Sequence, residues 1–135
     1  MRNADLVDIL IVEDNPNDAE LTIRALKKQN LIQQMYIAKD GEEALLRFSA
    51  AQHDNTPFEL VVLDLTIPGG IGGKDTLTAL RACDPHIKAI VSSGYSNDPI
   101  MANHRAHGFD GVITKPFRYT DVIATLNHVL AAHAV

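Results

Sequence analysis

Residues 7–15 read VDILIVEDN, a run of apolar residues that stops at two acids and an asparagine. Two later stretches have the same character, LVVLDL at residues 60–65 and AIVS at residues 89–92. Consecutive apolar residues are typical of a strand that is covered on both faces, as in a parallel sheet between two helix layers. These stretches therefore predict an α/β fold.

Five short apolar stretches alternate along the chain with segments of helical periodicity. The predicted strands are Val7–Val12, Met35–Ala38, Leu60–Leu65, Ala89–Ser92 and Gly111–Thr114. Alternating strands and helices imply right-handed crossovers and a doubly wound sandwich. We therefore predict a flavodoxin-like (βα)5 fold with a five-stranded parallel sheet in the order 2-1-3-4-5, whose switch point lies between the first and third strands.

The predicted helices carry recognisable start and stop signals. Asn15-Pro16 offers an N-cap followed by a proline at the first helical position, and Asp40 with Glu43 resembles a capping box. A third helix should end before Asp84-Pro85, and a fourth should begin at Asp98-Pro99. The apolar face of the fourth helix is weak (Ile100, Ala102, Ala106), whereas the last helix has a clear stripe (Val122, Leu126, Val129, Leu130).

Length and composition indicate a single domain over residues 1–135. No stretch approaches a membrane span, and the lone Cys83 excludes an internal disulfide, which favours a cytoplasmic location. The net charge is −5, from 12 basic and 17 acidic residues, and the basic residues are scattered. Nucleic-acid binding needs a clustered basic face, so we expect a protein partner, with no nucleic acid and no membrane.

Chemically active side chains follow four of the predicted strands. Glu13 and Asp14 follow the first strand and Asp64 ends the third, while Ser93 and Lys115 end the fourth and fifth. The carboxyl ends of parallel strands share one edge of the sheet, where ligands bind in this kind of fold. A single acid after a strand is more often a helix cap than a ligand, but this joint placement predicts a site.

The residue types at this edge indicate phosphoryl chemistry. Carboxylates that lie close together repel each other, and Mg²⁺ relieves the repulsion because it prefers oxygen ligands. Lys115 and Ser93 could contact the oxygens of a transferred phosphoryl group. A metal, an ammonium and a hydroxyl around an aspartate are the parts needed to transfer a phosphoryl group to a carboxylate.

Four sequence blocks resemble the signatures of response-regulator receiver domains, which are CheY-like modules of two-component phosphorelays. The blocks are VDILIVEDN at 7–15, VVLDLTIP at 61–68, IVSSG at 90–94 and TKPF at 114–117. The resemblance implies that Asp64 is the phosphoacceptor and that Lys115 contacts the phosphoryl group. It also implies that Ser93 is the switch hydroxyl. The Mg²⁺ ligands implied are Asp14, Asp64, the backbone carbonyl of Thr66 and, through water, Glu13.

The same resemblance implies the partners of the domain. A sensor histidine kinase or a phosphotransfer protein would donate the phosphoryl group, docking against the first helix. The fourth helix, fifth strand and fifth helix would form the output face for a downstream protein, with the chain a monomer or a phosphorylation-modulated dimer. Such a domain is no enzyme beyond promoting its own phosphorylation and dephosphorylation. The alternative is a receiver-like interaction module that works without phosphorylation. The stretch from Asp64 to Arg118 is also similar to receivers of hybrid sensor histidine kinases, so a stand-alone regulator and a domain of a larger kinase both stay open.

The chain departs from the receiver pattern at two places. Val112 stands where the family usually has an aromatic residue, three positions before the lysine, so Tyr95 or a shift of the fourth helix would have to carry the signal. The loop at residues 68–73, PGGIGG, is longer and richer in glycine than usual, which predicts a mobile lip beside Asp64.

Three other phosphate chemistries fail on particular residues. The spacing from Gly69 to Gly73 is one residue short of a P-loop, and Asp75 replaces its hydroxyl residue. Glu13, Asp14 and Asp18, the acids after the first strand, would repel a flavin phosphate. Haloacid-dehalogenase-like phosphatases need a second aspartate where this chain has Thr66.

Overall fold

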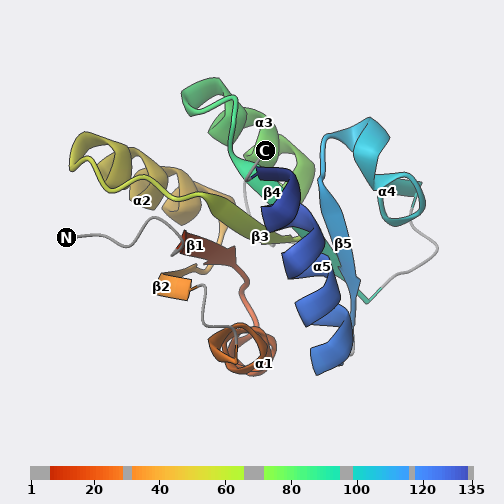
Figure 1. Cartoon of the computed structure of the whole chain (residues 1–135). Coiled ribbons are helices and arrows are strands. Elements are labelled where there is room, and N and C mark those ends of the chain that lie inside the picture. The colour runs from red at the N-terminus through yellow and green to blue at the C-terminus, as the bar shows by residue number, and fades with distance from the viewer. Residues whose placement is uncertain (1–6, 29–31, 66–71, 95–98, 116–117, 134–135) are drawn as a thin grey trace.

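The computed structural model describes residues 7–28, 32–65, 72–94, 99–115 and 118–133. Strands and helices alternate along these residues (Figure 1). Their bounds are β1 (Val7–Val12), α1 (Pro16–Lys27), β2 (Ile32–Ala38), α2 (Gly41–His53), β3 (Leu60–Asp64), α3 (Gly73–Cys83), β4 (Lys88–Ser93), α4 (Pro99–Ala102), the 3-10 helix η1 (His104–His107), β5 (Gly111–Thr114) and α5 (Tyr119–His133).

The five strands form one sheet in the order β2-β1-β3-β4-β5, and every neighbouring pair is parallel. This confirms the predicted doubly wound fold and its strand order. The switch point between β1 and β3 lies near the middle of the sheet. Both strands are buried along their whole length, as their consecutive apolar residues predicted.

Alternate residues of each strand face two separate cores. Leu10 and Val12 of β1 pack with residues of α2 and α3, whereas Ile9 and Ile11 pack with residues of α1 and α5. Figure 1 shows α2 and α3 on one side of the sheet and α1 and α5 on the other. Because successive side chains of a strand point to opposite faces, each strand supplies apolar contacts to the helices on both faces of the sheet.

The predicted helix starts are confirmed at two places. The Asn15 side chain accepts hydrogen bonds from the backbone N–H groups of Asn17 and Asp18, and Pro16 is the first residue of α1. The Asp40 side chain accepts from the N–H of Glu43 at the start of α2. The predicted stripe of α5 is also confirmed, because all four of its residues are buried.

The predicted bounds of β3 and β4 differ from the structure by one residue at one or both ends, and the sequence prediction was wrong over longer stretches in two other elements. Strand β2 begins at Ile32 rather than Met35, because the polar residues Gln33 and Gln34 belong to an exposed edge strand with no apolar run to mark it. Helix α4 has only four residues before η1, and its buried residue is Met101, whereas Ala102 and Ala106 are exposed. None of the described helices is long and apolar enough to cross a membrane.

Candidate phosphoacceptor site

Register brings the predicted site residues to one edge of the sheet. Val12 pairs with Leu63, so Glu13 after β1 lies beside Asp64 at the end of β3. Asp64 in turn pairs with Ser92 of β4, and Ser93 pairs with Thr114 of β5. The backbone N–H of Lys115 then donates to the carbonyl of Ser93 over 2.9 Å. The carboxyl ends of four strands therefore converge as the sequence predicts.

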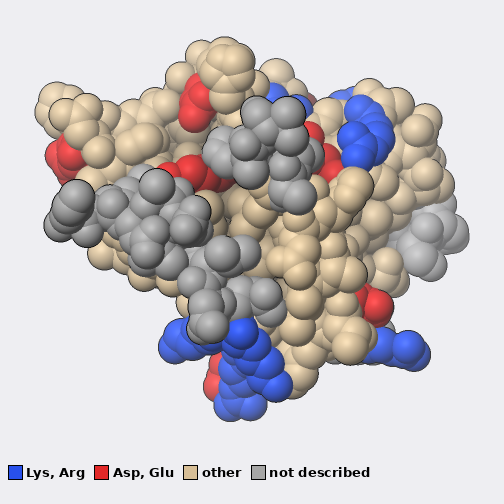
Figure 2. Space-filling view, in the orientation of Figure 1, with Lys and Arg blue, Asp and Glu red and all other residues tan. Residues whose placement is uncertain are grey.

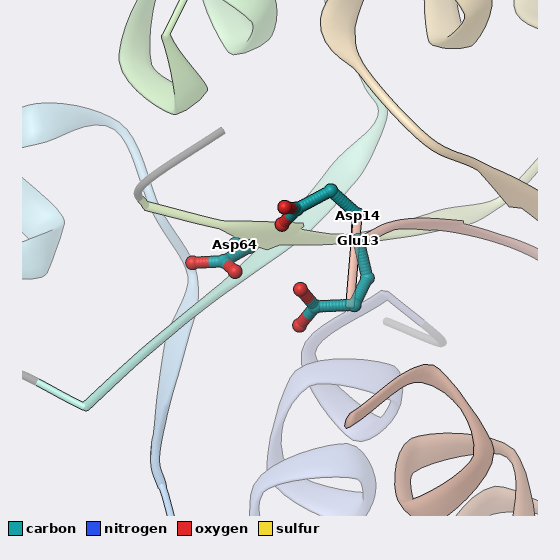
Figure 3. Close-up of side chains that lie close together, drawn as sticks. All are labelled: Glu13, Asp14 and Asp64. Atoms are coloured by element: carbon teal, nitrogen blue, oxygen red, sulfur yellow. The ribbon is translucent and has the colours of Figure 1, made fainter. Parts of the chain in front are cut away.

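Three carboxylates form the centre of this site. One oxygen from each of Glu13, Asp14 and Asp64 lies within 4.8 Å of the others. Figure 3 shows the three side chains converging, Asp64 from the end of β3 and the other two from the segment after β1. Glu13 and Asp64 are buried and Asp14 is exposed, so the cluster opens to solvent on the side of Asp14.

The ammonium of Lys115 contacts two of these acids and a further one, Asp18. Its Nζ donates to Glu13 Oε1 over 2.8 Å, to Asp64 Oδ2 over 3.0 Å and to Asp18 Oδ2 over 3.0 Å. The contact partners lie 102, 51 and 97 residues away along the chain. Lys115 thereby joins β5 to β1, β3 and α1 at one point.

Burial and charge shift the pKa values of two groups here. Burial and the neighbouring Asp64 carboxylate together raise the pKa of Glu13 to about 7, although the hydrogen bond from Lys115 acts to lower it. Burial alone would lower the pKa of Lys115, but its hydrogen bonds to Glu13, Asp18 and Asp64 raise that pKa above its ordinary value. The Lys115 ammonium is therefore charged across the physiological range, and the Glu13 carboxyl changes its charge near neutrality.

The donor set fits a hard divalent cation. Three carboxylates contact the Lys115 ammonium, and the candidate ligand atoms of the Glu13, Asp14 and Asp64 cluster are all carboxylate oxygens. Mg²⁺ prefers such ligands and tolerates a site with few of them, because it keeps several waters. The neighbouring Asp64 carboxylate contributes to the raised pKa of Glu13, and a bound divalent cation would relieve that repulsion.

Of the other residues that the sequence predicts for the site, some lie within the residues that the structure describes and some lie outside them. Ser93 ends β4 and is 1% exposed. Thr66 lies outside the described residues, as do Tyr95 and residues 68–71 of the glycine-rich loop. Gly73 is within them and begins α3, where an added Cβ would lie 2.7 Å from the carbonyl oxygen of Asp64. This glycine lets α3 approach the phosphoacceptor strand closely.

Val112, which replaces the family's aromatic residue, is half-buried on β5. Beside it lies a shallow cavity of about 330 Å³ that is lined mainly by side chains of η1 and α5 (His104, Arg105, Ala124, Thr125, His128) together with Asp110 and Gly111. The Nη2 of Arg105 lies 3.1 Å from Nε2 of His128 across this cavity. The predicted output face thus has a shallow cavity that is lined in part by Arg105 and two histidines.

The sequence interpretation missed Asp18 as a partner of Lys115. It treated this residue only as one of the acids that would repel a flavin phosphate. The available signal was its place in the first turn of the helix that follows Glu13-Asp14, because such a residue stays near the edge of the sheet.

Comparison with known families agrees with this geometry. Residues 9–127 match the family described as the response regulator receiver domain. The chain is 30% identical over 132 residues to the probable transcriptional regulatory protein TcrX of Mycobacterium tuberculosis, and the match covers 96% of this chain and 53% of that protein. The chain likewise spans about half the length of other curated relatives.

Two solved structures illustrate the likeness in fold. A CheY-like receiver domain protein from Methanospirillum hungatei aligns with a TM-score of 0.78 at 24% identity, covering 96% of this chain and 97% of that one. The bacteriophytochrome response regulator AtBRR aligns with a TM-score of 0.75 at 28% identity, covering 92% of each chain.

Proposed function

The chain belongs to the response regulator receiver domain family, and we propose that it accepts a phosphoryl group on Asp64. Receiver domains are signalling modules of two-component systems rather than conventional enzymes, and they work with sensor histidine kinases and downstream targets. The observation that carries the proposal is the contact of Lys115 with Asp64 inside a cluster of three carboxylates.

The proposed step is an in-line transfer from a phosphohistidine. A carboxylate oxygen of Asp64 attacks the phosphorus atom, so that an O–P bond forms while the N–P bond breaks. The electron pair of the broken bond stays on the imidazole nitrogen, which takes up a proton. Lys115 faces the negative charge that collects on the phosphoryl oxygens, and Ser93 donates to one of them after transfer.

Mg²⁺ would be held by Asp14 and Asp64, by the backbone carbonyl of Thr66 and, through water, by Glu13. When bound, it would neutralise charge on the phosphoryl oxygens. The chain's own contribution is to hold Asp64 at a fixed strand end. It also keeps Lys115 charged, because three carboxylates surround the ammonium.

We assign the two partner surfaces to different elements. The phosphodonor docks against α1, whose last turn and C-cap carry Arg24, Lys27 and Lys28. Figure 2 shows basic side chains gathered at the end of the molecule where Figure 1 places α1. The output face comprises α4, β5 and α5, where the cavity beside Val112 lies. A cytoplasmic location, where such donors and targets meet, fits this scheme.

Intact-mass measurement after incubation with acetyl phosphate and Mg²⁺ tests the proposal. The wild type should gain the mass of one phosphoryl group, and Asp64→Asn should gain none. Asp75→Asn is the matched control, because Asp75 is an exposed aspartate on α3 and should leave the adduct unchanged. No adduct on the wild type, or an undiminished adduct on Asp64→Asn, would refute the proposal.

The interaction module without phosphorylation is the weaker proposal, because a module of that kind has no use for a cluster of three acids, two of them buried. Mg²⁺ titration followed by NMR separates the two functions. A phosphoacceptor should give saturable shifts at Asp14 and Asp64, and a module that does not bind the cation should give none.

A further inference from the structure

Lys115 uses its whole hydrogen-bonding capacity in this structure. An ammonium group has three N–H donors and no acceptor. The three acceptors within 3.0 Å of Lys115 Nζ are oxygens of Glu13, Asp18 and Asp64. A phosphoryl oxygen can therefore bind Lys115 only if one of these three contacts is given up.

Asp18 differs from the other two acceptors in place and in exposure. Its side chain is 30% exposed, against 3% for Glu13 and 7% for Asp64. Water can replace Lys115 at a partly exposed carboxylate, whereas a buried carboxylate without its partner pays the full desolvation penalty. Asp18 is thus the contact that is lost most readily.

The backbone around Asp18 holds its side chain toward Lys115. The N–H of Asp18 donates to Asn15 Oδ1 over 3.2 Å, and its carbonyl accepts from the Thr22 hydroxyl over 3.0 Å. Thr22 is buried, so the first turn of α1 is fixed from both sides. The carboxylate reaches Lys115 from a rigid helix end rather than from a loose loop.

We propose that Asp18 is a positioning residue that retains the Lys115 ammonium before phosphorylation and releases it to the phosphoryl group afterwards. The proposal rests on the proposed function of Asp64. In the resting domain Asp18 draws Lys115 toward α1 and adds a negative charge beside the place where the phosphoryl oxygens arrive. Both effects oppose phosphorylation, so Asp18 slows it.

The place of Asp18 on α1 gives this contact a further role. Helix α1 is the element against which the phosphodonor is proposed to dock. A donor that contacts the first turn of α1 can pull Asp18 away from Lys115 at the moment of transfer. Phosphorylation by a docked protein would then be less affected by Asp18 than phosphorylation by a small molecule.

Initial rates of phosphorylation by acetyl phosphate and Mg²⁺ test the proposal. Asp18→Asn removes the charge and should raise the rate by about fivefold, the effect expected of one partly exposed ion pair. Asp18→Glu keeps the charge and should stay close to the wild-type rate. The control is Asp75→Asn, since Asp75 is the third residue of α3 as Asp18 is of α1, and it should also leave the rate unchanged.

Two further measurements separate positioning from a purely structural role. The 13C signal of Lys115 Cε should shift in Asp18→Asn and not in Asp75→Asn. Mg²⁺ affinity, measured by calorimetry, should not increase in Asp18→Asn, because a carboxylate has been removed from the site. A faster rate together with tighter Mg²⁺ binding would assign the effect to the metal and overturn the proposal.

Failure of the inference and failure of the proposed function give different results. If the wild type gains no phosphoryl group, the function assigned to Asp64 is wrong. If the wild type is phosphorylated but Asp18→Asn is no faster, or is slower, Asp18 does not retain Lys115 and the inference alone is overturned.

Discussion

At the scale of single residues, Glu13 carries the electrostatic strain of the site. It is 5% exposed, it lies next to Asp64, and its pKa is raised to about 7. The unfolded chain gives a glutamate an ordinary pKa near 4.5. The folded protein therefore binds the Glu13 proton more tightly than the unfolded chain does, and ionising this group works against folding.

The sign of this shift predicts a pH dependence in protein freed of divalent cations. Stability should fall as pH rises from about 4.5 through about 7, by up to roughly 3 kcal/mol from this group. Glu13→Gln has no proton to lose, so its stability relative to the wild type should increase from pH 5 to pH 8. Urea unfolding of both proteins in EDTA at the two pH values measures the difference.

Asp121→Asn serves as the control for Glu13, because Asp121 is exposed in the first turn of α5. Its effect on stability should be the same at both pH values. A difference between wild type and Glu13→Gln that does not change with pH would contradict the raised pKa.

At the scale of elements, two adjacent glycines at the start of α3 differ in whether a side chain would fit. They are the N-cap Gly72 and the first helical residue Gly73. A Cβ on Gly73 would lie 2.7 Å from the carbonyl oxygen of Asp64 and 3.2 Å from Cα of Leu65, both backbone atoms. A Cβ on Gly72 would meet nothing within 4 Å. The close approach of α3 to the end of β3 therefore requires a glycine at position 73 but not at position 72.

Gly73→Ala should destabilise the protein by about 1–3 kcal/mol, because backbone atoms at the end of β3 must move to admit the methyl group. The same movement displaces Asp64, so the yield of phosphorylated protein should also fall. Thermal unfolding and intact mass measure the two effects. Gly72→Ala is the matched control, and equal losses in both variants would show that the close approach is not the cause.

The elements also show what the sequence could predict. Apolar runs mark β1 and β3 because both are covered on two faces, and caps such as Asn15 mark helix starts. The sequence prediction made β2 three residues too short, because Gln33 and Gln34 lie on the edge strand of the sheet, where no burial enforces an apolar pattern. Gly73 was interpreted as a source of flexibility, since only the structure places it against Asp64.

At the scale of the whole molecule, the site exists only where four separate parts of the chain meet. Glu13 and Asp14 follow β1, Asp18 belongs to α1, Asp64 ends β3 and Lys115 follows β5. The convergence of Glu13, Asp64 and Lys115 was predictable because parallel strands end at one edge. The side-chain contact between Asp18 and Lys115 was not, since it depends on how α1 leans on the sheet.

A site assembled in this way predicts that Mg²⁺ stabilises the fold. The cation binds the folded chain and not the unfolded one, so a concentration 100 times its dissociation constant should add about 2.7 kcal/mol. Thermal unfolding with and without MgCl2, at equal ionic strength, measures the shift in Tm. The Asp14→Asn, Asp64→Asn double variant should lose the shift, and an equal shift in the double variant would place the cation elsewhere.

The long sequence separations between Lys115 and its partners also have a consequence during synthesis on the ribosome. The acids of residues 13–18 are synthesised about a hundred residues before the ammonium that neutralises them, and β5 is the last of the five strands of this sheet to be made. A nascent chain that stops short of β5 holds its acids without their counter-ion. The proposed site is therefore complete only after Lys115 has been made, and until then its acids repel one another without the ammonium that contacts three of them.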